Sequence, residues 1–175
     1  MPYISLTAIG KDKPGIVAEI TKVLCDLRCN IEDSTMTILH DQFAMILIVK
    51  LANGVLQKTL SSKLNAAAKK LFLSLSFSQI PDFSSRKKKN ANPYVISVYG
   101  KDKTGIVASI SGFLAAKKVN ITNVKTTLSK SAYIMLIEAD FPAKLDVKKL
   151  SDELSSFAKE LNLTAHINRA QSSEI

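Results

Sequence analysis

The sequence predicts an α+β protein with two ferredoxin-like βαββαβ domains in tandem. The first observation behind this prediction is an internal repeat, because Gly10–Ala18 reads GKDKPGIVA and Gly100–Ala108 reads GKDKTGIVA. The same offset continues without a gap to Met45 and Met135, so the chain holds two copies of one folding unit. The second observation is the order of the elements that the hydrophobic pattern predicts within each copy, which is that of the split βαβ fold.

The first half of copy one contains a predicted strand, a helix and a second strand. Tyr3–Ile9 is a short run rich in β-forming residues that ends at Gly10, which is typical of a strand. After the following loop, apolar residues recur at the spacing of one helical face: Ile16, Val17, Ile20, Val23, Leu24 and Leu27. Asn30 is expected to end this helix, and the alternating segment Ile31–Leu39 predicts the second strand.

The second half of copy one begins after a turn at residues 40–42. Phe43–Val49 predicts a third strand that is apolar on both faces. A second helical stripe follows the breaker Asn53-Gly54 and consists of Leu56, Leu60, Leu64, Ala67, Ala68 and Leu71. Leu73–Ile80 alternates and predicts the fourth strand, and Pro81 closes the domain.

Copy two repeats this order of elements. Its helices are predicted from Gly105 onward and along a stripe at residues 147–161, and its strands are Tyr94–Tyr99, Val119–Ser129, Ala132–Phe141 and Leu163–Arg169. Four antiparallel strands with both helices on one face leave the other sheet face open. Because the third strands are apolar on both faces, we expect this surface to be covered by the sister domain or by a second chain, and hence at least a homodimer.

The excess basic charge is concentrated between the two copies. We assign residues 1–80 and 93–170 to the two domains, residues 81–92 to a linker and residues 171–175 to a tail. Of the net charge of +9, a charge of +3 falls in the linker, which contains the run SRKKKN. A solvated linker kept extended by self-repulsion explains this run, and the alternative is an electrostatic handle for nucleic acid or an acidic protein surface. Because the basic residues have no aromatic residues among them, we do not expect direct nucleic-acid binding.

Several classes of function find no support in the residues. No apolar run reaches the roughly 18 residues of a membrane span, and the N-terminus lacks the pattern of a signal peptide, so we expect a cytoplasmic protein. Cys25 and Cys29 are interpreted as small buried hydrophobic residues rather than metal ligands. His40 and His166 have no acidic or cysteine partner at a useful spacing, and we interpret both as surface histidines. We therefore predict no catalytic residues, no metal site and no cofactor.

The glycines of the repeated loop are interpreted by their positions. Gly10 and its counterpart Gly100 are expected to permit a turn with positive φ. Gly15 and its counterpart Gly105 are expected to let a ligand approach the backbone closely. Pro14 suits the first turn of a helix, whereas the residue at the same place in copy two, Thr104, can accept a capping hydrogen bond.

The chemistry of the loop suits a free amino acid. The unpaired N–H groups at the start of a helix form an anion site that fits a carboxylate. Asp12 and Asp102 can pair with an ammonium group, and the neighbouring lysines 11, 13, 101 and 103 add positive field. The alternative is that the loop is only a tight connector between strand and helix, in which the aspartate caps the helix.

This loop, the helix after it and the Asn-Ile pair that begins the next strand resemble the ACT domain, a regulatory amino-acid-binding fold, over nearly the whole chain. The tandem arrangement is similar to that of the glycine cleavage system transcriptional repressor family. The resemblance implies that ligand lies between the loop of one domain and the start of the second strand of a neighbour. By position it implies binding roles for Gly10, Asp12, Pro14, Gly15, Ile16, Asn30 and Ile31, and for Gly100, Asp102, Thr104, Gly105, Ile106, Asn120 and Ile121.

Some of these positions allow a second interpretation or differ between the copies. Asn30 and Asn120 also fit a residue that ends a helix in the left-handed conformation. Thr104 departs from the proline that is usual in the family, and Glu32-Asp33 is replaced by Thr122-Asn123. We therefore expect the two copies to bind ligand with unequal affinity.

The resemblance implies a non-catalytic regulatory protein. Such a protein would sense a small amino acid, with glycine or serine the first candidates, at ACT domain interfaces. It would control a regulatory protein partner, and through that partner the transcription of genes for amino-acid metabolism. The alternative is a nucleic-acid-binding or structural interaction module that uses the basic linker and no ligand.

Overall fold

The computed structural model describes residues 2–81, 93–129 and 132–170 and divides the chain into two compact units, Met1–Arg86 and Lys87–Ile175. Each unit has its own sheet and its own hydrophobic core. The basic run of the predicted linker and the predicted tail at residues 171–175 lie outside the described residues.

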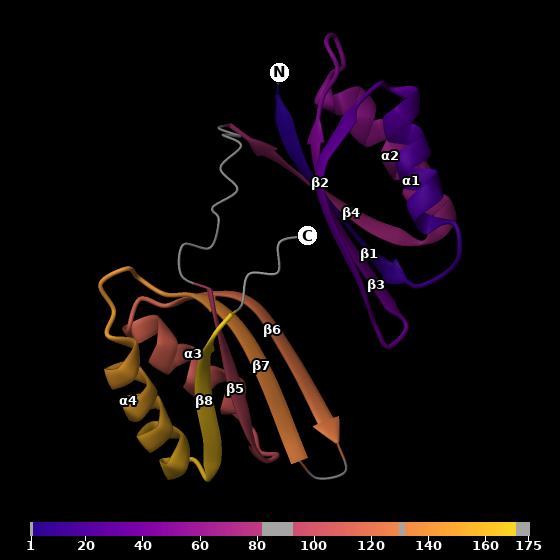
Figure 1. Cartoon of the computed structure of the whole chain (residues 1–175). Helices are drawn as coiled ribbons and strands as arrows, with labels where there is room; N and C mark the ends of the chain where they lie inside the picture. The colour runs from indigo at the N-terminus through magenta and orange to yellow at the C-terminus, as the bar shows by residue number, and fades with distance from the viewer. Residues whose placement is uncertain (1, 82–92, 130–131, 171–175) are drawn as a thin grey trace. The chain divides into compact units, whose positions relative to one another are not determined.

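Both units have the predicted order βαββαβ (Figure 1). Unit 1 consists of β1 Tyr3–Lys11, α1 Ile16–Asp26, β2 Asn30–Leu39, β3 Gln42–Lys50, α2 Gln57–Leu71 and β4 Leu73–Ile80. Unit 2 consists of β5 Pro93–Lys101, α3 Ile106–Ala116, β6 Asn120–Ser129, β7 Ala132–Asp140, α4 Val147–Glu160 and β8 Leu163–Arg169. The sequence patterns therefore predicted the type and order of these elements correctly, with small differences at their ends.

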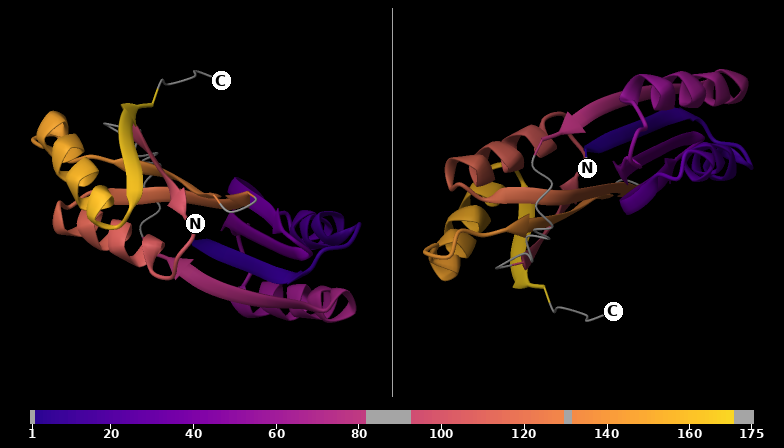
Figure 2. Two further views of the ribbon diagram at one scale, coloured as in Figure 1. Left: turned by 90° about the horizontal axis from the view of Figure 1, so that it is seen from below. Right: turned by 90° about the horizontal axis from the view of Figure 1, so that it is seen from above.

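The strands of each unit form one antiparallel sheet, in the order β2-β3-β1-β4 in unit 1 and β6-β7-β5-β8 in unit 2. The edge strands are thus β2 and β4, and β6 and β8. Both helices of a unit cover the same face of its sheet, as Figures 1 and 2 show from different directions. This is the ferredoxin-like arrangement that the element order predicts.

The third strand of each sheet carries apolar side chains on both faces, as predicted. In β3, Phe43, Met45, Leu47 and Val49 are buried on the helix-covered face, whereas Ile46 is 44% exposed on the other. In β7, Met135, Ile137 and Ala139 are buried, whereas Ile134 and Leu136 are 39% and 44% exposed. Each unit by itself therefore leaves apolar surface on its open sheet face.

The first helix of each unit ends in a Schellman motif. The N–H groups of Arg28 and Cys29 donate to the carbonyl oxygens of Cys25 and Leu24, over 2.8 and 2.9 Å. Arg28 has φ 53°, and its counterpart Lys118 has φ 59° in the same arrangement. The left-handed residue is thus a basic residue and not Asn30 or Asn120, so that second interpretation of the asparagines was wrong.

The cysteines and histidines lie largely at the surface. Cys25 is exposed on α1, so the prediction that it is buried was wrong; Cys29 is half-buried, and both thiols are free. His40 and His166 are exposed, as expected, and His166 Nε2 lies 3.0 Å from the hydroxyl of Tyr99.

None of the helices in the described part of the chain has the length and the apolar character that a membrane-spanning helix needs.

Candidate functional site

The loop between β1 and α1 in unit 1 is tied to the turn between β2 and β3. The N–H of Asp12 donates a hydrogen bond of 2.7 Å to the carbonyl oxygen of Asp41. This bond continues the ladder of β1 and β3, which begins with the pair Lys11 and Gln42. The start of the loop is therefore held in place by backbone pairing and does not depend on the side chain of Asp12.

The prediction of positive φ at Gly10 and Gly100 was wrong. Gly10 does not have positive φ, whereas Gly15 has φ 93° and Gly105 has φ 95°. A Cβ at Gly10 would lie 2.7 Å from Leu73 Cδ2 and 2.9 Å from the carbonyl oxygen of Phe72. Gly10 is therefore required by close packing of β1 against the start of β4, and the left-handed turn falls on Gly15.

Helix α1 begins without a side-chain cap. Its N-cap residue is Gly15, no side chain accepts a hydrogen bond from the first turn, and the first helical bond runs from Glu19 N–H to Gly15 C=O over 2.9 Å. Pro14 precedes the N-cap rather than lying in the first turn. The N–H groups of residues 16–18 consequently have no carbonyl partner within the helix.

Helix α3 begins in the same way, with Gly105 as its N-cap and no side-chain cap. The prediction that Thr104 caps this helix was therefore wrong. Both helices therefore have uncapped N-termini directly after the repeated loop. The positive end of the helix dipole at these N-termini favours an anionic group.

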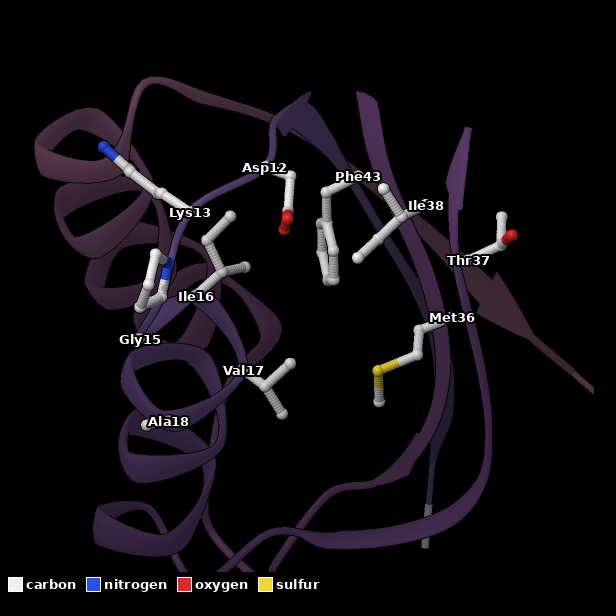
Figure 3. Close-up of a pocket in the computed structure, with 11 residues that line it drawn as sticks. Asp12, Lys13, Gly15, Ile16, Val17, Ala18, Met36, Thr37, Ile38 and Phe43 are labelled. Carbon is white, nitrogen blue, oxygen red and sulfur yellow. The ribbon is translucent and has the colours of Figure 1, made fainter. Parts of the chain in front are cut away.

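A groove of about 540 Å³ lies between the start of α1 and the edge strand β2 (Figure 3). Its wall on the loop and helix side is formed by Asp12, Lys13, Pro14, Gly15, Ile16, Val17 and Ala18. Its wall on the sheet side is formed by Met36, Thr37, Ile38 and Phe43. Four of the predicted site residues therefore line one cavity within unit 1: Asp12, Pro14, Gly15 and Ile16. Gly10 does not line it, but it is paired with Phe43, which does.

The side chains in this groove have distinct orientations. Figure 3 shows the carboxylate of Asp12 pointing toward the space that Ile16 and Phe43 line, while Val17 and Met36 point into the groove from its two walls. Lys13 points away from it, and its ammonium lies 5.0 Å from the centre of the Phe72 ring. No other described residue forms a hydrogen bond or an ion pair with the Asp12 side chain.

Asn30 and Ile31 do not share this groove. Asn30 is paired with Lys50, which is paired with Tyr3, whereas Gly10 lies at the other end of β1. Seven residue steps along β1, from Tyr3 to Gly10, separate the two ends, which corresponds to about 24 Å. Within one unit the two halves of the predicted site thus lie at opposite ends of the sheet, and the same register holds for Asn120 and Gly100.

The start of β2 contains a β-bulge that the sequence pattern did not reveal. The register shifts between Ile31 and Asp33, so Glu32 is the additional residue, and its carboxylate accepts a hydrogen bond of 3.1 Å from Asn30 Nδ2. Ile31 packs against the core. Because the bulge interrupts the alternation, Glu32 and Asp33 do not have to point to opposite faces.

Unit 2 places related groups at the equivalent loop. Burial raises the pKa of the Tyr133 phenol, and the negative charge of Asp102 raises it further, so this carboxylate lies near position 133. The Tyr133 hydroxyl donates to Met135 Sδ over 3.8 Å. Phe43 takes the place of this tyrosine in unit 1, so the acid of unit 1 faces a more apolar surface.

The remaining predicted residues of unit 2 lie where their counterparts do. Ile106 is buried in the core, as Ile16 is, so each of the two can offer a ligand mainly its backbone. Ile121 packs against the core, and the register shifts between it and Asn123.

Within the described residues there is no group of three or more His, Cys, Asp or Glu side chains that could hold a metal ion.

Sequence reasoning missed the sheet-side wall of the groove. Met36 and Ile38 are 52% and 57% exposed although they point to the same face as the core. The available signal was the alternation of β2, in which two large apolar residues recur on an edge strand. Whether a helix covers them depends on the tertiary structure, and α1 leaves them open.

Comparison with known proteins identifies related sequences for both units. A family model described as the ACT domain matches residues 3–78 and again residues 92–168. A UPF0237 protein of Methanococcus maripaludis is 44% identical over 71 residues, which cover 41% of this chain and 76% of that protein. The glycine cleavage system transcriptional repressor of Escherichia coli K12 is 43% identical over 47 residues, which cover 27% of this chain and 25% of that protein.

Two solved structures share the fold over nearly the whole chain. A protein from Galdieria sulphuraria that is described as an unknown protein superposes with a TM-score of 0.78 at 24% identity, covering 97% of this chain and 99% of that one. A protein assigned as a glycine cleavage system transcriptional repressor superposes with a TM-score of 0.72 at 16% identity, covering 98% of each chain. At these identities the likeness shows a shared fold.

Proposed function

The chain belongs to the ACT domain family, and from this premise we propose that it is a non-catalytic regulatory protein that senses a small amino acid. The observation that carries the proposal is the groove at the start of α1, which brings together the Asp12 carboxylate, an uncapped helix N-terminus and an apolar wall. A free amino acid has a group that fits each of these three features. Its ammonium group can pair with the Asp12 carboxylate, its carboxylate can accept hydrogen bonds from the N–H groups, and its side chain can contact the apolar wall.

Binding is coupled to regulation through the arrangement of ACT units. The loop and Asn30 lie at opposite ends of one sheet, so a ligand that contacts both groups must join two units, from one chain or from two. A ligand that favours one arrangement by about 1–3 kcal/mol changes the contact surface offered to a protein partner. The similarity to a glycine cleavage system transcriptional repressor supports a role in transcriptional regulation, with glycine and serine as the first ligands to test.

A thermal-shift screen of the full chain against the twenty amino acids tests this function. A ligand that binds only the native state must raise the melting temperature, by a stabilisation of about 2.7 kcal/mol at a concentration of 100 Kd. We expect at least one small amino acid to do so. If none of the twenty raises the melting temperature at millimolar concentration, the proposed function is wrong.

A further inference from the structure

The groove of unit 1 is larger and more apolar than glycine or serine requires. Its volume of about 540 Å³ falls in the range of about 300–1,000 Å³ that small-molecule sites occupy. Val17, Met36 and Ile38 line it, and the two β2 side chains are more than half exposed although they point to the helix-covered face. Exposed apolar side chains that converge on one cavity favour an apolar group as its occupant.

The polar groups lie at one end of this cavity. Asp12 points toward the space between Ile16 and Phe43 (Figure 3), and it has no hydrogen-bond or ion-pair partner among the described residues. The backbone of Gly15–Ala18, which includes the uncapped first turn of α1, lines the same cavity. The charge pattern is thus that of a site for a molecule with a cation and an anion at one end and an apolar body at the other.

We propose that unit 1 binds α-amino acids with an apolar side chain, such as leucine or methionine. The ammonium group pairs with Asp12, and the ligand side chain lies along Val17, Met36 and Ile38. This inference rests on the proposed function, in which the chain binds a free amino acid, and it replaces glycine and serine with apolar amino acids as the ligands of unit 1. A single methylene group in an apolar pocket changes affinity by about 10–200-fold, so a branched side chain is a sufficient basis for selection against glycine.

The acid at the end of the groove argues against a second protein surface as the occupant. An apolar surface seated there would remove the Asp12 carboxylate from water without supplying a partner, which is unfavourable. The ammonium group of an amino acid supplies that partner. Unit 2 offers a comparison, because Thr126 replaces Met36 and Tyr133 replaces Phe43, so its equivalent surface is more polar.

Isothermal titration calorimetry on the full chain, with leucine, glycine, isopentylamine and 4-methylpentanoate as probes, tests the inference. We expect leucine to bind at least about tenfold more tightly than glycine. Each of the two fragments, which lack one of the charged groups, should bind more weakly than leucine. Ile38→Thr should remove most of the preference for leucine, and the matched variant Leu128→Thr in unit 2 should retain it. If Ile38→Thr does not fold, Met36→Thr, which introduces the residue of unit 2 at an exposed edge position, gives the same readout.

Three results would overturn the inference. Equal affinities for leucine and glycine would contradict the apolar selection but leave the proposed function intact. Absence of binding by any amino acid would contradict both. If Ile38→Thr leaves leucine binding unchanged and instead converts a dimer into a monomer by light scattering, the groove accommodates a second copy of the chain and not a ligand.

Discussion

The N–H of Asp12 and the carbonyl oxygen of Asp41 are joined by a hydrogen bond of 2.7 Å. This bond fixes the backbone of the loop against the β2–β3 turn while the Asp12 side chain stays free to face the groove. The stability of the loop therefore depends on the backbone of Asp12 and not on its carboxylate.

Removal of this carboxylate should weaken amino-acid binding and leave the fold intact. Asp12→Ala retains the backbone hydrogen bond and deletes only an exposed side chain, so the melting temperature should change little. Asp102→Ala is the corresponding change in unit 2. Calorimetry should show reduced affinity in each variant, because the ammonium group loses its acceptor. If the chain binds an amino acid and neither variant binds it less well, the ligand does not use these acids.

Substitution of Gly10 should destabilise unit 1 for reasons of packing. In Gly10→Ala the added Cβ meets Leu73 Cδ2 at 2.7 Å and the Phe72 carbonyl oxygen at 2.9 Å, and the backbone atom cannot move cheaply. We expect a loss of about 1–3 kcal/mol in the free energy of unfolding by urea. The control is Gly112→Ala in α3, where a Cβ meets no atom within 4 Å. That variant should gain about 0.5–1 kcal/mol, and a loss of similar size in both variants would refute the packing argument.

The two units should bind amino acid with unequal affinity, and unit 1 should hold the tighter site. Pro14 restricts the loop of unit 1 where unit 2 has Thr104, so less conformational freedom is lost on binding. Glu32 and Asp33 place two exposed carboxylates near the start of β2, at the opposite end of the sheet from this loop, so they can contribute only to a site that a second unit completes. In unit 2 the acid near the corresponding position is Glu138, which accepts a hydrogen bond of 3.3 Å from Asn123, as Glu32 does from Asn30 in unit 1.

A matched pair of tryptophan variants tests this inequality. Gly15 and Gly105 are unsuitable positions because their positive φ would strain any larger residue. Val17 and Val107 occupy equivalent helical positions, so Val17→Trp and Val107→Trp each obstruct one site. We expect Val17→Trp to remove the tighter phase in calorimetry. Loss of that phase in Val107→Trp alone would reverse the assignment.

The ion pair between Lys117 and Glu153 should make stability depend on pH. The hydrogen bond from Lys117 lowers the pKa of the Glu153 carboxyl. A carboxyl whose pKa is lower in the folded state contributes stability above its unfolded pKa of about 4.3, and this contribution is lost as the pH falls through the folded value. Lys117→Met should therefore cost more stability at about pH 7 than at about pH 3.

Glu153→Gln provides the control for this pH effect. Lys117 also lies over the Phe113 ring, 5.7 Å from its centre, and that contact does not depend on the carboxyl. In a Glu153→Gln background, the cost of Lys117→Met should become the same at both pH values. If the cost in the wild-type background is already independent of pH, the ion pair does not contribute.

The chain should form at least a dimer in solution. Ile46, Ile134 and Leu136 remain 44%, 39% and 44% exposed on the open sheet faces of their own units, and such apolar surface is usually covered by another domain or chain. Light scattering at micromolar concentration should give at least twice the chain mass of 19.1 kDa. A strictly monomeric species with the Ile46 face open to solvent would contradict this expectation.

Much of the fold followed from local patterns in the sequence. The stripe from Ile16 to Leu27 identified the buried face of α1, and the alternation in Leu73–Ile80 gave the bounds of β4. These patterns suffice because helix and strand periodicities are set by the backbone over a few residues. The repeat then extended each assignment to unit 2, and the element order determined the ferredoxin-like topology.

The parts that the sequence did not determine depend on contacts between distant residues. Gly10 is small because of Leu73 at the start of β4 and Phe72 just before it, and not because of its own φ. The register of β1, β2 and β3 decides that Asn30 lies far from the loop, and the extent of α1 decides that Met36 and Ile38 stay open. The sequence by itself thus determined which elements form, while only the tertiary structure decided which side chains meet, because strand register and helix coverage are set by packing between segments far apart in the chain.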